Sequence, residues 1–199
     1  MDGRFLKAFT DPARVTCLGK VVYPFCLKYR VRLLAIDSPF VTEGQKVTPL
    51  DLLVAVKICA EEPLGELTLF EKLKVLRLQR RPTLFEAELE RFIAYVHVSA
   101  WPKYWAKNTA SKGEAEDVGI PWPLGIVTAL VKAGWEEKRA WEMPECQAVW
   151  YNAAISAANG SDSKLLTTDE EAFLEKLEAE EKVAKSAEVK TPEPNGPET

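Results

Sequence analysis

The sequence contains a single histidine, His97, and histidine is the side chain most suited to acid–base chemistry near neutral pH. We expect His97 on a helix, two residues before Ser99, and this spacing puts the two side chains on different faces. No cysteine or acid stands nearby in sequence to complete a triad, although distant residues can converge in a fold. We therefore interpret His97 as a partly buried helical residue. The enzyme alternative would gain support from a ligand pocket that contains its side chain.

Other signatures of catalysis are missing from the sequence. It contains no GxxxxGK[ST], GxGxxG, HExxH or GxSxG motif, which removes the commonest phosphate, dinucleotide, zinc-protease and hydrolase sites. Acids stand side by side at Glu61-Glu62 and at Glu136-Glu137. Because adjacent positions do not face each other on a helix, we expect solvated turns there and not paired catalytic carboxylates. We predict that the protein is not an enzyme and has no catalytic residues.

The four cysteines are scattered without CxxC spacing, and three of them lie in apolar surroundings such as VKICA and YPFCL. This pattern is typical of small buried thiols in a reducing cytoplasm. With one histidine and no close cysteine pair, a zinc site would need an unusual set of ligands. We expect no metal and no cofactor. The cysteines are Cys17, Cys26, Cys59 and Cys146.

The net charge of −4 is unevenly distributed along the chain. Residues 169–199 hold ten acids and four lysines, a local charge of −6, so the remainder is close to neutral. A nearly neutral body is not typical of a general nucleic-acid binder. No stretch reaches the roughly 18 apolar residues that span a bilayer, and the N-terminus lacks the apolar core of a secretory signal. We expect a cytoplasmic protein with no nucleic-acid or membrane partner.

The densest basic run lies toward the end of one predicted helix. Positive charge is favoured there by the helix dipole, so a structural role is sufficient to explain it. Nucleic-acid binding is disfavoured because aromatic residues are not interleaved with the charges. The run could instead meet an acidic partner or the acidic tail of the protein itself. Its members are Lys72, Lys74, Arg77, Arg80 and Arg81.

All six tryptophans fall within fifty residues, between Trp101 and Trp150. Tryptophan is costly to expose, and it dominates protein interfaces when it is exposed. We expect most of the six to pack in the second half of the core. Trp101 and Trp105, beside a long polar loop over residues 102–120, are the two that we expect to contact a protein partner.

Four predicted helices begin with a threonine followed three residues later by an acid. In this capping box the hydroxyl accepts a backbone N–H of the first turn, and the acid reaches back to the N–H of the cap. Two of the boxes have the same sequence, TLFE, but the residues after each copy differ. We attribute the repetition to recurrence of a good helix start and not to an internal repeat. The boxes are Thr48–Asp51, Thr68–Glu71, Thr83–Glu86 and Thr168–Glu171.

The apolar pattern predicts how these helices pack. The helix over residues 49–60 is apolar nearly all round, so we place it at the centre of the fold. The helix over residues 84–100 has a single apolar stripe, which we expect to be buried. Further helices are predicted over residues 24–36 and 121–134, and from Pro144 to the Asn159-Gly160 stop. The stripe of the 84–100 helix consists of Phe85, Leu89, Phe92, Ile93 and Val96.

A last amphipathic helix is predicted from Thr168, and its thin apolar stripe is a second candidate partner-binding surface, formed by Phe173, Leu174 and Leu177. The predicted fold class is all-α, with a short β-hairpin between residues 14 and 23 and an acidic, partly disordered tail. We divide the chain into a helical domain, residues 1–165, and the acidic helix and tail, residues 166–199.

Residues 120–173 resemble small helical proteins encoded in the structural modules of tailed bacteriophages, in particular tail assembly chaperones. The resemblance covers about a quarter of the chain. It lies in a tryptophan, a Met-Pro helix start, an alanine-rich helix that ends in a glycine turn, and an acidic helix. The residues that carry it are Trp141, Met143, Pro144, Trp150, Tyr151, Gly160 and the acidic helix after Thr168.

The resemblance implies a non-catalytic chaperone that binds the long, apolar tape measure protein in the host cytoplasm until tail subunits polymerise around it. It also implies an oligomer as the working form. Apolar grooves between helices and an acidic tail suit such a role. Two alternatives stay open: a structural virion component, such as a connector or head–tail joining protein, and a generic helical adaptor that binds other proteins.

Overall fold

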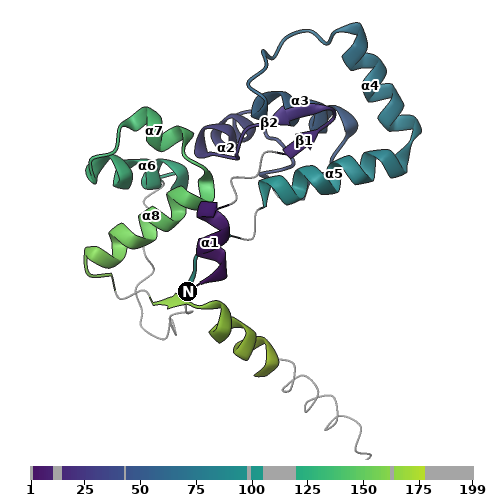
Figure 1. Cartoon of the computed structure of the whole chain (residues 1–199). Coiled ribbons are helices and arrows are strands. Elements are labelled where there is room, and N and C mark those ends of the chain that lie inside the picture. Colours follow the sequence, from purple (N-terminus) through teal and green to yellow (C-terminus); the bar gives the residue numbers. More distant parts are fainter. Residues whose placement is uncertain are drawn as a thin grey trace, which may run out of the picture.

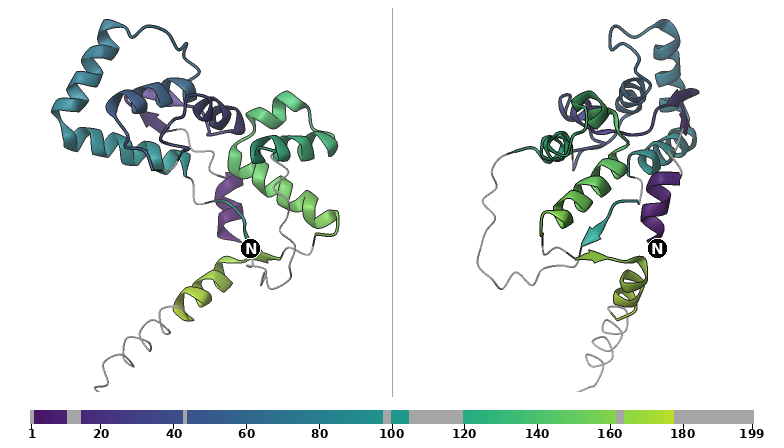
Figure 2. Two further views of the ribbon diagram at one scale, coloured as in Figure 1. Left: turned by 180° about the vertical axis from the view of Figure 1, so that it is seen from behind. Right: turned by 60° about the vertical axis from the view of Figure 1, so that its left-hand side comes forward.

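The structure is a computed structural model that describes residues 2–10, 15–42, 44–97, 100–104, 120–161 and 164–177. It confirms the mainly helical class and the short hairpin, and Figures 1 and 2 show how the elements are arranged. In chain order the elements are α1 (Gly3–Thr10), β1 (Val15–Cys17), β2 (Lys20–Val22), α2 (Leu27–Leu34), α3 (Pro49–Cys59), α4 (Leu69–Arg80), α5 (Pro82–Val96), β3 (Lys103–Tyr104), α6 (Trp122–Lys132), α7 (Glu137–Glu142), α8 (Glu145–Ala158), β4 (Leu165–Leu166) and a further helix over residues 168–177.

β1 and β2 form the predicted antiparallel hairpin, in which Thr16 lies opposite Val21. The two loop residues, Leu18 and Gly19, have φ values of 52° and 73°, which suit a two-residue hairpin loop. Glycine adopts this conformation without strain, whereas leucine does so rarely. Leu18 is held in it because its N–H donates a 2.7 Å hydrogen bond to the carboxylate of Glu88 on α5.

α3 lies at the centre of the first core, as its apolar sequence predicts. Seven of its eleven residues are buried. The hairpin, α2, α4 and α5 pack around it. The largest buried side chain of this core is Phe92 on α5, whose ring meets Phe40 edge-on with centroids 4.7 Å apart.

The buried stripe of α5 differs from the prediction at one position. Phe92 and Val96 are buried, and Phe85 and Leu89 pack against the first core from its edge. Ile93 is exposed, however, and Tyr95 is buried in the stripe. Its hydroxyl donates a hydrogen bond to the backbone carbonyl of residue 23, which makes burial of this aromatic ring favourable.

α6, α7 and α8 form a second core, the green group of Figure 1, into which α2 inserts Leu27. The two cores are joined where α2 meets the start of α8. The Arg30 guanidinium donates two hydrogen bonds to the Glu145 carboxylate, one of them 2.8 Å long, and stacks 5.3 Å from the ring centroids of both Phe25 and Trp122. Burial raises the pKa of Glu145, and the Arg30 charge opposes this effect.

Two of the four predicted capping boxes are confirmed, Thr48–Asp51 and Thr68–Glu71. The box at Thr83 is wrong because α5 begins at Pro82, two residues before the predicted start at Leu84, and has no side-chain cap. The last box is displaced by one residue. Thr167 and not Thr168 caps the final helix, and Glu170 accepts the hydrogen bond from the Thr167 backbone.

Several boundaries also differ from the predictions. The helix predicted from residue 24 begins at Leu27, after an extended stretch in which Cys26 forms a β-bridge with Pro144. The sequence patterns do not predict α1 or α7, and α7 starts at Glu137, where the sequence predicts a turn. The predicted long loop contains β3, which pairs with β4, and its residues 105–119 lie outside the described residues.

Candidate protein-binding surface

α4 is attached to the protein by charged side chains as well as by apolar ones, since Val75 and Leu78 pack at the first core. The Glu71 carboxylate is buried against α3, where the Lys57 ammonium lies 2.8 Å away and that of Lys20 3.9 Å away. On the next turn, the Lys74 ammonium donates a 2.7 Å hydrogen bond to the carbonyl of Leu18. Leu78 is the one large apolar residue that α4 buries fully. The inner face of this helix is therefore unusually rich in charge.

The outer face of α4 is apolar. Leu69, Phe70, Leu73 and Leu76 are 70%, 82%, 54% and 47% exposed. Leu69, Leu73 and Leu76 follow one another at helical spacing and form a continuous stripe, with Phe70 at its edge. Globular proteins normally bury such a stripe, and a large exposed apolar patch marks an interaction site. We call these four residues the α4 stripe.

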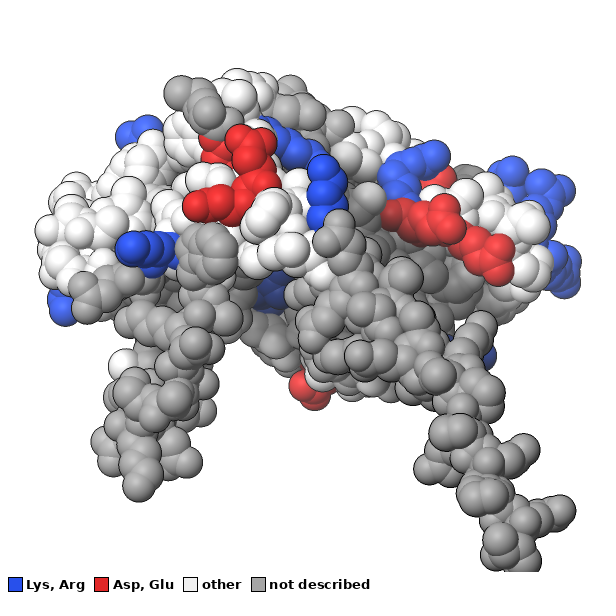
Figure 3. Space-filling model, turned by 90° about the horizontal axis from the view of Figure 1, so that it is seen from below, with Lys and Arg blue, Asp and Glu red and all other residues white. Residues whose placement is uncertain are grey.

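The C-terminal end of the α4 stripe is basic. A pocket of about 270 Å³ is lined there by Leu73, Leu76 and three arginines, Arg77, Arg80 and Arg81. Within the described part of the chain, no carboxylate lies within 4.0 Å of these arginines. At the end of the molecule where α4 and α5 lie, Figure 3 shows basic side chains along the outer edge and acidic side chains beside them. The surface thus combines exposed apolar side chains with positive charge that is not neutralised by any described carboxylate.

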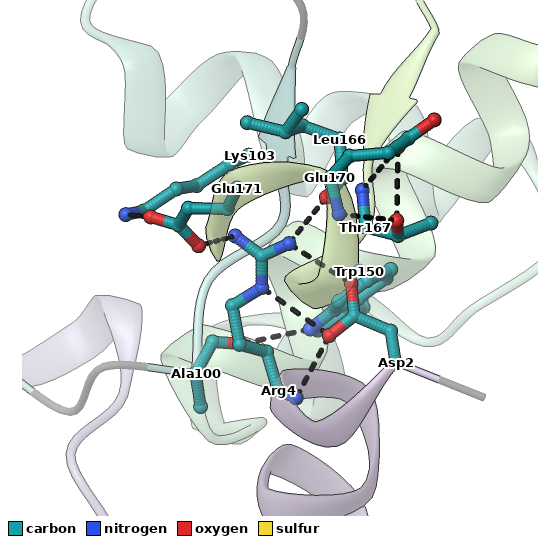
Figure 4. Close-up of polar contacts among 9 residues, drawn as sticks. All are labelled: Asp2, Arg4, Ala100, Lys103, Trp150, Leu166, Thr167, Glu170 and Glu171. Atoms are coloured by element: carbon teal, nitrogen blue, oxygen red, sulfur yellow. Dashed lines mark hydrogen bonds and ion pairs between the residues drawn. The ribbon is translucent and has the colours of Figure 1, made fainter. Parts of the chain in front are cut away.

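A second exposed apolar face lies on the acidic helix, residues 168–177. A junction around Arg4 holds this helix in place, as Figure 4 shows. The Arg4 guanidinium is nearly buried, lies 3.0 Å from the Asp2 carboxylate and 3.1 Å from that of Glu171, and also donates to the carbonyl of Leu166. Lys103 on β3 forms an ion pair with the other oxygen of Glu171. The N-terminus, β3 and β4 therefore all converge at the start of the acidic helix.

The predicted partner-binding residues of the acidic helix lie mainly in solvent. Phe173 is 60% exposed and Leu177 is 44% exposed, and they stand one turn apart, while Leu174 is half-buried. Four acids and one lysine surround this short apolar face within residues 168–177. Glu171 points toward Arg4 and Lys103, so the junction orients the helix with Phe173 away from it.

The predicted tryptophan surface is described in part. Trp101 is partly exposed and meets Trp122 edge-on, with ring centroids 5.5 Å apart, while Trp105 lies outside the described residues. Trp135 and Trp141 pack against the second core, as expected. The Trp150 indole donates a 2.8 Å hydrogen bond to the carbonyl of Ala100.

The exposure of His97 differs from the prediction, and its surroundings bear on the enzyme alternative. It is exposed and not partly buried, because α5 ends at Val96. It does line a pocket, of about 450 Å³, together with Arg30, Val96, Trp101 and Trp122. Arg30 is engaged by Glu145, and the described lining contains no hydroxyl, thiol or carboxylate that could act with the imidazole. The pocket alone therefore supports no reaction class.

Three of the four thiols have an inert environment. Cys17, Cys26 and Cys59 are buried, and burial raises the pKa of Cys17 and Cys59 to about 12 and that of Cys26 to about 11. At neutral pH these side chains are protonated and poorly nucleophilic. Among the described residues, no cluster of three histidines, cysteines or acids is placed to hold a metal ion. In the same part of the chain, no helix combines the length and apolar composition that a bilayer crossing requires.

Comparison with known proteins gives no relative: no family model, no curated protein and no solved structure matches this chain.

Sequence reasoning located the acidic helix with Phe173 and Leu177, and it also located the basic run of α4. It missed the α4 stripe. The sequence did contain a signal for it. The helix LFEKLKVLRLQR has apolar residues on both of its sides, and because one core can cover only one side, the other side must stay exposed.

Proposed function

We propose that this protein is a non-catalytic chaperone that covers an apolar helical segment of a client protein with the α4 stripe. The observation that carries the proposal is a helix that packs charged residues inward beside Leu78 and leaves Leu69, Leu73 and Leu76 in water. A stripe with i, i+4, i+7 spacing suits helix-on-helix recognition. The arginines at its end favour client segments in which acids adjoin the apolar residues.

The sequence resemblance to tail assembly chaperones supplies the specific client. A tape measure protein is long and apolar, and its segments need cover before tail subunits polymerise around it. The proposed chaperone works in the host cytoplasm and leaves the client as the tail forms. An exposed apolar surface that is stable without its partner is what such transient binding requires.

The test is co-expression with the tape measure protein of the same genome. We expect the native chain to raise the soluble fraction of that protein. A double variant, Leu69→Glu with Leu73→Glu, removes the α4 stripe without touching the core, and we expect it to lose this effect. Leu124→Glu on α6 is the matched control, because Leu124 is 46% exposed and lies far from α4. Equal solubility with the native chain and the double variant would exclude the α4 stripe as the client site.

The virion-component alternative is separated by a different measurement. Quantitative mass spectrometry would compare the protein in producing cells with the protein in purified particles. Presence in cells and absence from particles is the expected result for a chaperone. A fixed copy number in particles would replace the proposal with a structural role, such as a connector or head–tail joining protein.

A further inference from the structure

The α4 stripe and the acidic helix are complementary in both shape and charge. Each presents large apolar side chains one turn apart, Leu69 and Leu73 on α4, and Phe173 and Leu177 on residues 168–177. The first lies beside arginines that have no ion-pair partner among the described residues, and the second lies on a helix, residues 168–177, with a local charge of −3. Opposite charge steers two such surfaces together and fixes their orientation.

The two surfaces are too far apart to meet within one chain. In every view of Figures 1 and 2, α4 lies at the upper end of the molecule and the acidic helix at the lower end, with α1 and α8 between them. The Arg4 junction fixes the start of the acidic helix at this lower end. A contact between these surfaces must therefore join two copies of the chain.

We propose that the acidic helix of one copy packs on the α4 stripe of a second copy, so that the protein associates head to tail. An antiparallel arrangement satisfies both features. Phe173 and Leu177 then lie on the leucines of the partner's stripe, and Asp169, at the start of the acidic helix, lies near Arg80 at the end of α4. Antiparallel packing also places opposite ends of the two helix dipoles side by side.

This arrangement has consequences for assembly. The contact is heterologous, because each copy uses two different surfaces, and such contacts generate rings or open chains instead of closed dimers. Its apolar part is small compared with a standard protein interface, so the association is weak and depends on concentration. Because the attraction is partly between charges at the surface, added salt weakens it.

The same contact regulates client binding, a step that rests on the proposed function. The acidic helix of a neighbouring copy covers the α4 stripe when client is absent, and a client segment must displace it. Self-association and client binding therefore compete for one surface. Self-association itself does not depend on the identity of the client.

The experiment uses sedimentation velocity on the full chain, from low micromolar to near-millimolar concentration. We expect the native chain and the Leu124→Glu control to associate as concentration rises. Leu73→Glu, which breaks the α4 stripe, and Phe173→Glu, which breaks the acidic helix face, should each be monomeric alone. Mixed together, these two variants retain one intact pair of surfaces and should form a 1:1 dimer that cannot grow. Circular dichroism verifies that both variants are folded.

Two results would overturn the proposal. If the native chain stays monomeric at every concentration, the proposed contact does not form. Association of Phe173→Glu alone, with the same affinity as the native chain, shows that the acidic helix is not the occupant and points to α4 packing on α4. Neither result depends on the client.

Since Phe173→Glu leaves the α4 stripe free, it should also keep the client soluble at a lower chaperone concentration than the native chain does.

Discussion

The sequence TLFE occurs twice, at residues 68–71 and 83–86, and the two copies have opposite environments. In the first copy, the threonine caps α4, the phenylalanine is exposed and the glutamate is buried. In the second copy, the threonine lies inside α5, the phenylalanine packs against the first core and the glutamate is exposed. Four identical residues therefore do not determine which face of a helix is buried.

The difference arises from residues outside the tetrapeptides. Pro82 precedes the second copy and, with its fixed φ and missing N–H, is favoured at the first helical position, so the helix begins before the threonine. The first copy lies opposite Lys57, a nearly buried lysine of α3, whose charge needs a buried partner. Glu71 supplies it. With this contact on the inner side of α4, Leu69, Leu73 and Leu76 face solvent and form the proposed binding surface.

The largest difference in stability between variants of α4 and variants of α5 should appear when a phenylalanine is removed from each helix. Phe92→Ala in α5 leaves a cavity in the first core and should lower the free energy of unfolding by about 3–5 kcal/mol. Phe70→Ala in α4 removes an exposed ring and should change it by less than about 0.5 kcal/mol. Urea unfolding measures both. A loss of more than about 1 kcal/mol for Phe70→Ala would mean that α4 packs with its outer face inward.

The two glutamates should differ in how they respond to acid. The Lys57 ammonium donates a hydrogen bond to Glu71, and with the Thr68 backbone N–H it lowers the pKa of that carboxyl from 4.5 to about 2. A carboxylate with a lowered pKa contributes stability that is present above pH 4.5 and lost as the pH falls toward 2. We expect Glu71→Gln to be less stable than the native chain at neutral pH and to approach its stability in this acid range.

Glu86→Gln is the control for that measurement, because Glu86 is exposed and occupies the equivalent position of the second TLFE. Its urea midpoint should follow that of the native chain at every pH. If the gap between Glu71→Gln and the native chain stayed constant from neutral pH into the acid range, Lys57 would not be holding the carboxylate in its charged form.

Much of the fold was predictable because it depends on local pattern. The central α3 follows from an apolar sequence behind a Thr48–Asp51 cap, and the hairpin follows from two β-prone runs around Gly19. α1 was not predictable in this way. It is held by Arg4, whose partners Leu166 and Glu171 lie more than 160 residues away in sequence. No local pattern contains that information.

The candidate site was predictable to the extent that it lies on the acidic helix, where a thin apolar stripe remains without a core to cover it. The α4 stripe was missed because its exposure depends on the pairing of Glu71 with a lysine on another helix. The basic run drew attention to α4, since it allowed contact with an acidic partner beside its sufficient structural role. The apolar half of the α4 surface could not be predicted, because it depends on which side of α4 faces the core.

The smallest expected difference between the two TLFE copies lies in their threonines. The Thr68 hydroxyl accepts a 3.3 Å hydrogen bond from the Glu71 N–H, so Thr68→Ala should cost about 1 kcal/mol of stability. Thr83 is already inside α5 and caps nothing, so Thr83→Ala should change stability by less than about 0.5 kcal/mol. Urea unfolding of the two variants under the same conditions gives the comparison. Equal losses would mean that Thr83 also caps its helix and that α5 begins, as the sequence predicted, at Leu84.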